Sequence, residues 1–443
     1  MKQAGKIFIP GIFVPFVLAG CFISGQSAKM VSTPEKFANV NHPPVMSNVS
    51  DSFMYNLLAK YPHYFDSIIA RKDLLNVQII YTRIDRGKKE KDKVKFTDYT
   101  FNLNPDKYFY PASTVKLPVA ILALQKLNEL KITGLDKNTT MITGSAGSRQ
   151  TEVNNDPSAA DGRPTIAHYI KKILLVSDND AFNRLYEFLG QEYINHSLHK
   201  MGYTDAQLIH RLQISLTEEE NRHTNPVRFI DTAGKVLYDK PGENSKLVYA
   251  ARTTKLGNGY LSGDKLINEP FDFSKKNRLP LQNLHNIVKS IIFPEAVGEK
   301  QRFNLTKDDY AFLRKYMSMM PQESTSPVYP PPDYWDTYVK FMLYGSEKGK
   351  ANPNIRIFNK VGDAYGFLID AAYIADFKNN IEFIVSAVIY CNSDGIFNDD
   401  KYDYDTVGFP FFKHLGEVLY EYELKRQRKH KPDISSFRFQ YAE

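Results

Sequence analysis

Residues 355–390 read IRIFNKVGDAYGFLIDAAYIADFKNNIEFIVSAVIY and contain three apolar runs of strand length. The runs are Ile355–Val361, Phe367–Asp376 and Glu382–Tyr390, and turn-forming residues separate them. Because short turns join antiparallel neighbours, this stretch predicts one side of an antiparallel sheet.

The other strands of that sheet are expected near the start of the chain. VQIIYTRI at Val77–Ile84 is rich in β-branched residues, and a charged turn joins it to a second strand near Lys95–Leu103. A helix follows from about Ser113 to Leu130. Sheet strands at both ends of the chain, with helices between them, predict an α/β (α+β) fold with an antiparallel sheet flanked by helices and an all-helical lobe.

The domain organisation follows from this pattern. We expect one folded domain over residues 52–443, with the helical lobe at about 117–230 and an irregular insertion at about 231–354. Two helices are predicted within the insertion, at Leu281–Ile292 and Lys307–Met319. The final element, Phe409–Arg428, repeats apolar residues at helical spacing.

The first 51 residues have the features of a secreted, anchored protein. Lys2 and Lys6 precede the apolar run IFIPGIFVPFVL, which is too short to span a membrane and indicates a signal peptide over residues 1–20. LAGC at Leu18–Cys21 resembles a bacterial lipobox, in which the cysteine thiol receives a lipid. The alternative is an ordinary cleavage site. Lipidation of Cys21 predicts a polar tether over residues 21–51 and attachment to a membrane of the bacterial envelope, on the periplasmic side or the cell surface.

Composition excludes several classes of protein. The chain has 443 residues, 42% of them hydrophobic, and a net charge of +7, which supports a globular core and offers no argument for nucleic-acid binding. Its two cysteines, Cys21 and Cys391, are too few for a disulfide framework or a zinc ribbon. The acidic run NDDKYDYD at 398–405 lacks the glycine and terminal glutamate of a calcium loop, and no phosphate-binding loop is present. We therefore expect no metal and no cofactor.

Three short motifs carry the residues that could perform chemistry. Ser113-Thr-Val-Lys116 opens a helix, where residues three apart share a face and a lysine of lowered pKa can activate a serine. Ser177-Asp178-Asn179 precedes another helix, and Lys360-Val361-Gly362 ends a strand. Each motif alone also fits an ordinary helix cap, a solvated lysine or a strand end.

Together and in this order, the motifs resemble those of the penicillin-recognising serine enzymes, and most of all class A β-lactamases. The resemblance covers about residues 77–428 apart from the insertion. It implies that Ser113 is the acylated nucleophile, that Lys116 is its base and that Ser177 relays a proton to the leaving group. Substrate-binding roles are implied for Asn179, Lys360, Gly362 and Asp363, with the backbone N–H groups of Ser113 and Asp363 forming the oxyanion hole.

Three departures from the family pattern bear on the substrate. Class A enzymes carry a Glu-x-x-x-Asn loop whose glutamate activates the deacylating water, but no glutamate between Gly190 and Pro226 has an asparagine four residues later. Val361 stands where Thr or Ser usually binds the substrate carboxylate, and residues 361–377 include no Arg or Lys. We therefore expect slow deacylation and an incomplete carboxylate pocket.

The sequence thus predicts an envelope-anchored serine hydrolase that forms an acyl-enzyme with an amide or ester, including β-lactam or peptidoglycan-like compounds. The alternatives within the same fold are a D-Ala-D-Ala carboxypeptidase or slow penicillin-binding protein, and a binding lipoprotein that has lost the reaction. We expect a small-molecule or peptidoglycan-like partner, a membrane contact through the lipid on Cys21 and no nucleic acid.

Overall fold

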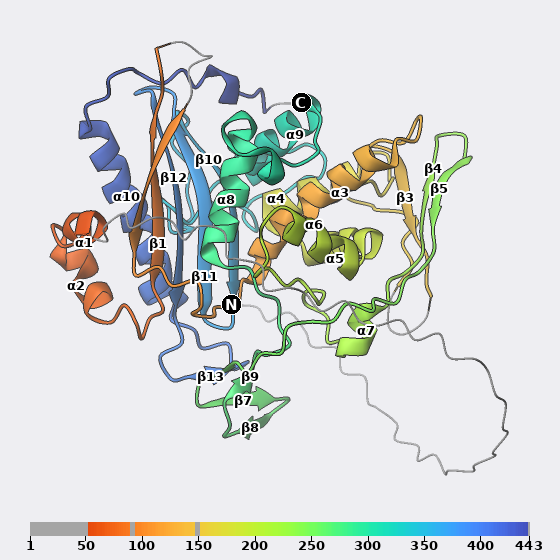
Figure 1. Ribbon diagram of the computed structural model, residues 1–443, viewed down its shortest axis with the longest axis horizontal. Helices are drawn as coiled ribbons and strands as arrows, with labels where there is room; N and C mark the ends of the chain where they lie inside the picture. The colour runs from red at the N-terminus through yellow and green to blue at the C-terminus, as the bar shows by residue number, and fades with distance from the viewer. Residues whose placement is uncertain (1–51, 89–93, 147–150, 442–443) are drawn as a thin grey trace. The chain divides into compact units, whose positions relative to one another are not determined.

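A computed structural model describes residues 52–88, 94–146 and 151–441 (Figure 1). The chain separates into Met1–Val45 and Met46–Glu443, and only the second unit contains described residues. The signal peptide predicted at 1–20, the tether at 21–51 and Cys21 all lie outside the described residues.

The main sheet has five antiparallel strands in the order β10-β11-β12-β1-β2. The chain contributes β1 (Gln78–Asp85) and β2 (Lys95–Phe101) early, and β10 (Ile355–Ala364), β11 (Phe367–Asp376) and β12 (Ile381–Tyr390) late. The two groups join where β1 pairs with β12, with Ile80 opposite Ser386. The predicted fold class is confirmed in this respect: strands from the two ends of the chain form one antiparallel sheet.

Side chains on the two faces of this sheet enter two different hydrophobic clusters. On β1, Ile80 and Ile84 belong to one cluster while Ile79 and Tyr81 belong to the other, as the alternation of a strand requires. α10 (Phe409–Lys425), α1 (Ser52–Leu58) and α2 (Pro62–Ala70) cover the second face, and α8 (Leu281–Ile292) and α9 (Lys307–Ser318) cover the first (Figure 1). Both faces of the sheet are therefore buried.

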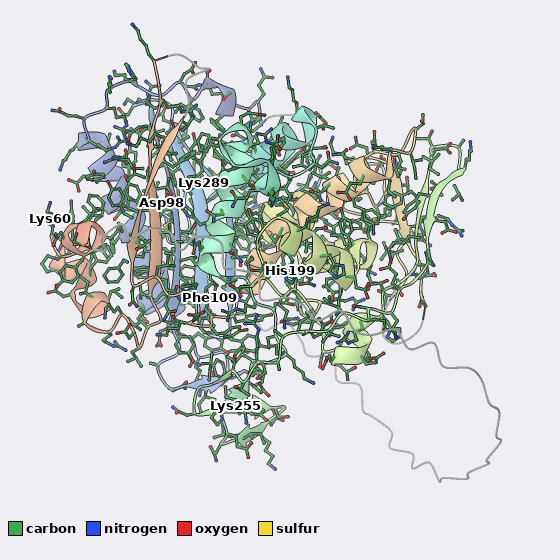
Figure 2. All side chains as sticks on the ribbon, in the orientation of Figure 1. Lys60, Asp98, Phe109, His199, Lys255 and Lys289 are labelled. Carbon is green, nitrogen blue, oxygen red and sulfur yellow. The ribbon has the colours of Figure 1, made fainter. Side chains whose placement is uncertain are left out.

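Polar side chains fix α8 to its face of the sheet. His285 lies between the hydroxyl of Thr82, at 2.7 Å, and that of Ser386, at 2.9 Å. One turn later, Lys289 forms an ion pair of 3.3 Å with Asp98 of β2 (Figure 2). Two helices of the predicted insertion thus belong to the layer that covers the sheet, although the boundaries 231–354 themselves stay a prediction.

The lobe beside the sheet is mainly helical. It contains α3 (Lys116–Leu130), α4 (Ile166–Val176), α5 (Asn179–Leu189), α6 (Gln191–Lys200) and α7 (Glu218–Arg222). It also contains an unpredicted antiparallel sheet of β3 (Thr140–Thr143), β4 (Val227–Ile230) and β5 (Val236–Lys240). The lobe is therefore not all-helical, because three strands of four or five residues, too short to show periodicity in the sequence, pair with one another.

The remaining elements are short. β6 (Lys255–Leu256) pairs with β9 (Phe271–Asp272), while β13 (Ile396–Phe397), β7 (Gly259–Ser262) and β8 (Lys265–Ile267) form a third small sheet. Near the start of the described chain, α1 and α2 are separate helices, and Pro62 begins the second of them. Within the described ranges, no helix is long and apolar enough to cross a membrane.

The sheet corrects one expectation about the substrate pocket. Val361 is 2% exposed and packs in the cluster of the second face, with α10, so it does not stand in for a carboxylate-binding hydroxyl. Its neighbours in β10, Lys360 and Gly362, face the other way because side chains alternate along a strand.

We predict that Val361→Thr destabilises the protein and leaves its reactivity toward carboxylate substrates unchanged. The substitution buries a hydroxyl among apolar groups, which costs about 1–3 kcal/mol in the free energy of unfolding. Denaturant unfolding measures this, with Val248→Thr, at a position 78% exposed, as the control. Unchanged stability together with faster acylation by a carboxylate substrate would place Val361 at the ligand instead.

Candidate active site

Ser113 lies at a strained junction between a loop and a helix. It belongs to the short 3-10 helix η1 (Ala112–Val115), which continues directly into α3. The preceding residue, Ala112, has a φ of 47°, a conformation that costs energy for a residue with a Cβ. The Ser113 side chain is half-buried and lines a cleft, as a nucleophile must.

Lys116 and Lys360 meet at Ser177. The Lys116 Nζ donates to the Ser177 carbonyl oxygen and lies 3.2 Å from its hydroxyl. The Lys360 Nζ donates to the same hydroxyl at 2.8 Å and to the Val361 carbonyl at 2.8 Å. The structure therefore brings together one residue from each of the three sequence motifs, which come from α3, from the break between α4 and α5, and from β10.

Burial weakens the proton affinity of both lysines. Burial lowers the pKa of Lys116 well below its usual range, and the charge of Lys360 lowers it further. Burial also lowers the pKa of Lys360 to about 7, although Asp363 and Asp370 oppose that shift. A neutral Lys116 beside a charged Lys360 is the arrangement in which Lys116 can accept a proton. No hydrogen bond joins Lys116 to the Ser113 hydroxyl in the described part of the chain, and such contacts often form only when substrate binds.

Gly362 allows the edge of the sheet to approach the serine. A Cβ on this residue would lie 2.9 Å from both the Ser113 nitrogen and the Pro111 carbonyl oxygen, closer than real Cβ atoms come. Only glycine therefore fits between β10 and η1. This approach brings the Gly362 backbone, which directly precedes Asp363, next to the Ser113 backbone nitrogen. The role of the Ser113 and Asp363 N–H groups as an oxyanion hole stays a prediction.

Asn179 begins α5, and its side chain points to a residue that the sequence analysis missed. The Asn179 amide donates to the Gln213 side-chain oxygen at 2.7 Å, and both residues line the cleft with Ser113. Its motif neighbour Asp178 caps α5 by accepting from the Ala181 N–H at 2.7 Å. Asn179 thus lines the cleft, and its role in substrate binding stays a prediction, while Asp178 caps the helix.

The loop that carries Gln213 is held by buried polar contacts. Asn183 of α5 bonds both the N–H and the carbonyl of Leu212, at 2.9 and 3.0 Å. Arg211 forms a buried ion pair of 2.6 Å with Glu187. Gln213 itself has a φ of 56°. A search for glutamates alone could not find this position, because a glutamine occupies it.

The cleft in front of Ser113 has a volume of about 420 Å³, the size of a small-molecule site. Its wall combines tyrosines with two carboxylates, Asp363 and Asp400, and includes no lysine or arginine among the described residues. The other residues of the wall are Tyr110, Ala112, Ser113, Asn179, Leu212, Gln213, Ala364, Tyr365, Asn398, Tyr402 and Tyr404. Asp400 belongs to the acidic run at 398–405, and no group of three or more metal-ligating side chains is found in the described ranges.

Comparison with protein families gives one match. Residues 79–245 match the model of the beta-lactamase enzyme family. The matched segment includes Ser113, Lys116, Ser177, Asn179 and Gln213 and ends before Lys360. No curated protein matches the sequence.

Solved structures of low sequence identity were also found. A β-lactamase from Xanthomonas campestris pv. campestris is 13% identical, with 83% of this chain and 98% of that chain covered and a TM-score of 0.45. A β-lactamase from Streptomyces albus G is 11% identical, with 82% and 99% covered and a TM-score of 0.45. A β-lactamase from Sphaerobacter thermophilus is 13% identical, with 82% and 97% covered and a TM-score of 0.42.

Proposed function

We propose, from the match of residues 79–245 to the beta-lactamase enzyme family model, that this protein is a serine hydrolase acting through a covalent acyl-enzyme on Ser113. The observation that carries the proposal is the contact of two buried lysines, Lys116 and Lys360, with the Ser177 hydroxyl beside the cleft that Ser113 lines.

In the proposed reaction, the Ser113 oxygen attacks the substrate carbonyl while its proton passes to the neutral amine of Lys116. The tetrahedral oxyanion that forms accepts hydrogen bonds from the N–H groups of Ser113 and Asp363. When this intermediate collapses, the leaving group receives the Ser177 hydroxyl proton, which Lys116 replaces. The ester on Ser113 is then hydrolysed by water, which restores the serine and releases the acid.

We propose that the substrate is an ester or amide whose carboxylate, if any, is not a main determinant of recognition. The cleft wall offers the carboxylates of Asp363 and Asp400, neither of which has an ion pair within the described residues. These charges repel an anionic substrate, whereas Lys360 is buried against the Ser177 hydroxyl and is not part of the cleft wall. A β-lactam or a peptidoglycan-like peptide is therefore the alternative substrate class, and a D-Ala-D-Ala carboxypeptidase the alternative activity.

The direct test is intact-mass analysis after exposure to a fluorophosphonate and, separately, to a penicillin. We predict one covalent adduct on the wild type and none on Ser113→Ala, because Ser113 lines the cleft at the start of a helix that also carries Lys116. Ser262→Ala, which removes an exposed serine of β7, serves as the control and should react like the wild type. An adduct retained on Ser113→Ala contradicts the proposal, and failure of every reagent to react with the wild type favours the binding lipoprotein instead.

We predict further that the acyl-enzyme is long-lived and that Gln213→Glu shortens its life by about a hundredfold or more. An amide cannot accept the proton of an attacking water, whereas a carboxylate at the same place can, and general bases contribute roughly 10²–10⁴ in rate. The protein is first acylated with a p-nitrophenyl ester, and the excess ester is removed. The rate at which the mass of the adduct then disappears is the deacylation rate.

Gln213→Leu is the matched control, since it keeps the size of the side chain without a proton acceptor. Equal adduct lifetimes in the Glu and Leu variants would mean that Gln213 does not face the acyl group. Rapid turnover by the wild type would mean that another residue already activates water.

We also propose that the protein is attached to an envelope membrane through a lipid on Cys21. Each buried methylene of such a chain contributes about 0.8 kcal/mol, so several chains hold a protein firmly. The prediction is that the wild type fractionates with membranes and carries lipid at Cys21 by mass, whereas Cys21→Ala is not matured at this site. A wild-type protein recovered in the soluble fraction without lipid would refute the anchor.

A further inference from the structure

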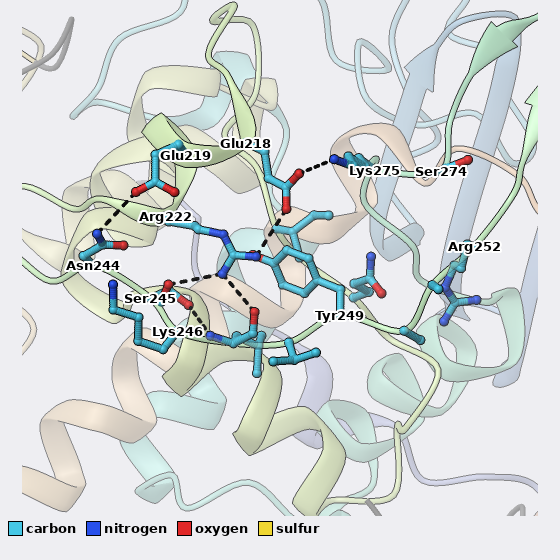
Figure 3. A pocket seen from close by; sticks show the side chains of 16 residues that line it. Glu218, Glu219, Arg222, Asn244, Ser245, Lys246, Tyr249, Arg252, Ser274 and Lys275 are labelled. Atoms are coloured by element: carbon cyan, nitrogen blue, oxygen red, sulfur yellow. Dashed lines mark hydrogen bonds and ion pairs between the residues drawn. The ribbon is translucent and has the colours of Figure 1, made fainter. Parts of the chain in front are cut away.

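A second hollow of about 560 Å³ lies beside α7 and shares no lining residue with the Ser113 cleft. Its wall is formed by α7 on one side and by residues 244–252 on the other, with Ser274 and Lys275 at one end (Figure 3). The proposed reaction uses none of these residues.

Most charges around this hollow are already paired. Glu218 forms ion pairs with Lys275, at 2.6 Å, and with Arg222, at 3.2 Å. Arg222 also donates to the carbonyl oxygens of Ser245 and Leu247 and stacks 4.5 Å from the centre of the Tyr249 ring (Figure 3). These contacts hold the wall together and leave Arg222 and Lys275 little capacity for a ligand.

Arg252 is different. It lines the hollow, and Figure 3 shows its side chain apart from the bonded network of Arg222 and Glu218. Its Nε is buried without a hydrogen-bond partner, and the guanidinium has no ion pair within the described residues. A buried cationic donor without a partner is costly, because neither water nor protein replaces its lost hydration.

A second arginine adds to this cost. Arg278 is 8% exposed, and its Nε is likewise buried without a partner; its Nη2 donates to the Pro105 carbonyl at 2.9 Å. Burial lowers the pKa of Arg252, and the positive charge of Arg278 lowers it further, while Asp205 opposes the shift without a hydrogen bond. Since a guanidinium does not lose its proton in proteins, the two arginines keep their positive charge, and an anion bound in the hollow would offset it.

We propose that this hollow binds the phosphate group of a small organic molecule, with Arg252 as the main contact. The two terminal Nη groups of a guanidinium carry four donors in one plane, and phosphate oxygens accept paired hydrogen bonds from them. The volume fits a small molecule, and apolar side chains are available for its organic part. They are Ile209, Leu247, Val248, Ala250 and Ala251.

The test is calorimetric titration of the full-length protein with phenyl phosphate and with inorganic phosphate, at constant ionic strength held by chloride. Saturable binding is expected for both, and tighter binding for phenyl phosphate because its ring contacts the apolar wall. Arg252→Gln should weaken binding by roughly tenfold to a hundredfold, the range expected for hydrogen bonds to a charged group. Arg252→Lys should bind with intermediate affinity.

Arg228→Gln is the matched control, because Arg228 is an exposed arginine of β4 that pairs with Asp239 outside the hollow. It should bind as the wild type does. Unchanged fluorophosphonate labelling of Ser113 and an unchanged melting temperature verify that each variant is folded; if the wild type is not labelled, the melting temperature alone serves. Absence of saturable binding to the wild type, equal affinity for acetate and phosphate, or unchanged affinity in a folded Arg252→Gln variant would each overturn the proposal.

Discussion

The contact of two lysine ammonium groups with one serine hydroxyl is the constraint on which the site depends. Burial lowers the pKa of both Lys116 and Lys360, and the nearby charge of Lys360 lowers the pKa of Lys116 further. A lysine whose pKa is lowered in this way can act as a base at neutral pH. The contact requires three elements to meet: helix α3, the turn between α4 and α5, and strand β10. The two helical elements belong to the lobe, and β10 belongs to the main sheet.

The sheet and its helices supply that meeting point. β10 is the edge strand of the main sheet, so one side of its backbone is not paired within the sheet and can face the cleft. Gly362 brings this edge against the start of α3. Ser177, in the left-handed conformation with a φ of 61°, ends α4 and turns both its carbonyl and its hydroxyl toward the lysines. The position of β10 in the sheet therefore also sets the position of Lys360 and Gly362 in the site.

Much of this could be predicted from the sequence because the signals are local. Apolar runs of strand length and β-branched residues predict the strands of the main sheet. The resemblance to the penicillin-recognising serine enzymes implies that the three motifs form one site, and Lys116, Ser177 and Lys360 meet there. The short strands β3–β5 carried no such signal, and neither did the position of α8 on the sheet, which depends on His285 and Lys289 contacting residues far away in the chain.

Two features of the site required the three-dimensional structure. Whether Val361 faces the ligand depends on which side of β10 is packed against α10, and a motif read along the chain does not contain that information. Gln213 was missed because its importance comes from its place beside Asn179 and Ser113, in a loop held by Arg211 and Asn183. The residue types in a sequence motif indicate which chemistry a site could perform. Which face of its element a side chain occupies, and which residues surround it, decide whether it can take part.

NMR titration of isotopically labelled lysine side chains measures directly whether the two lysines at Ser177 titrate far below an ordinary lysine. Signals are assigned by their loss in Lys116→Arg and Lys360→Arg. We expect Lys360 to titrate near a pKa of 7 and Lys116 to titrate well below the ordinary value of 10.5. If both groups titrate near 10.5 instead, neither lysine can act as a base toward Ser113 at neutral pH, and the proposed mechanism is wrong.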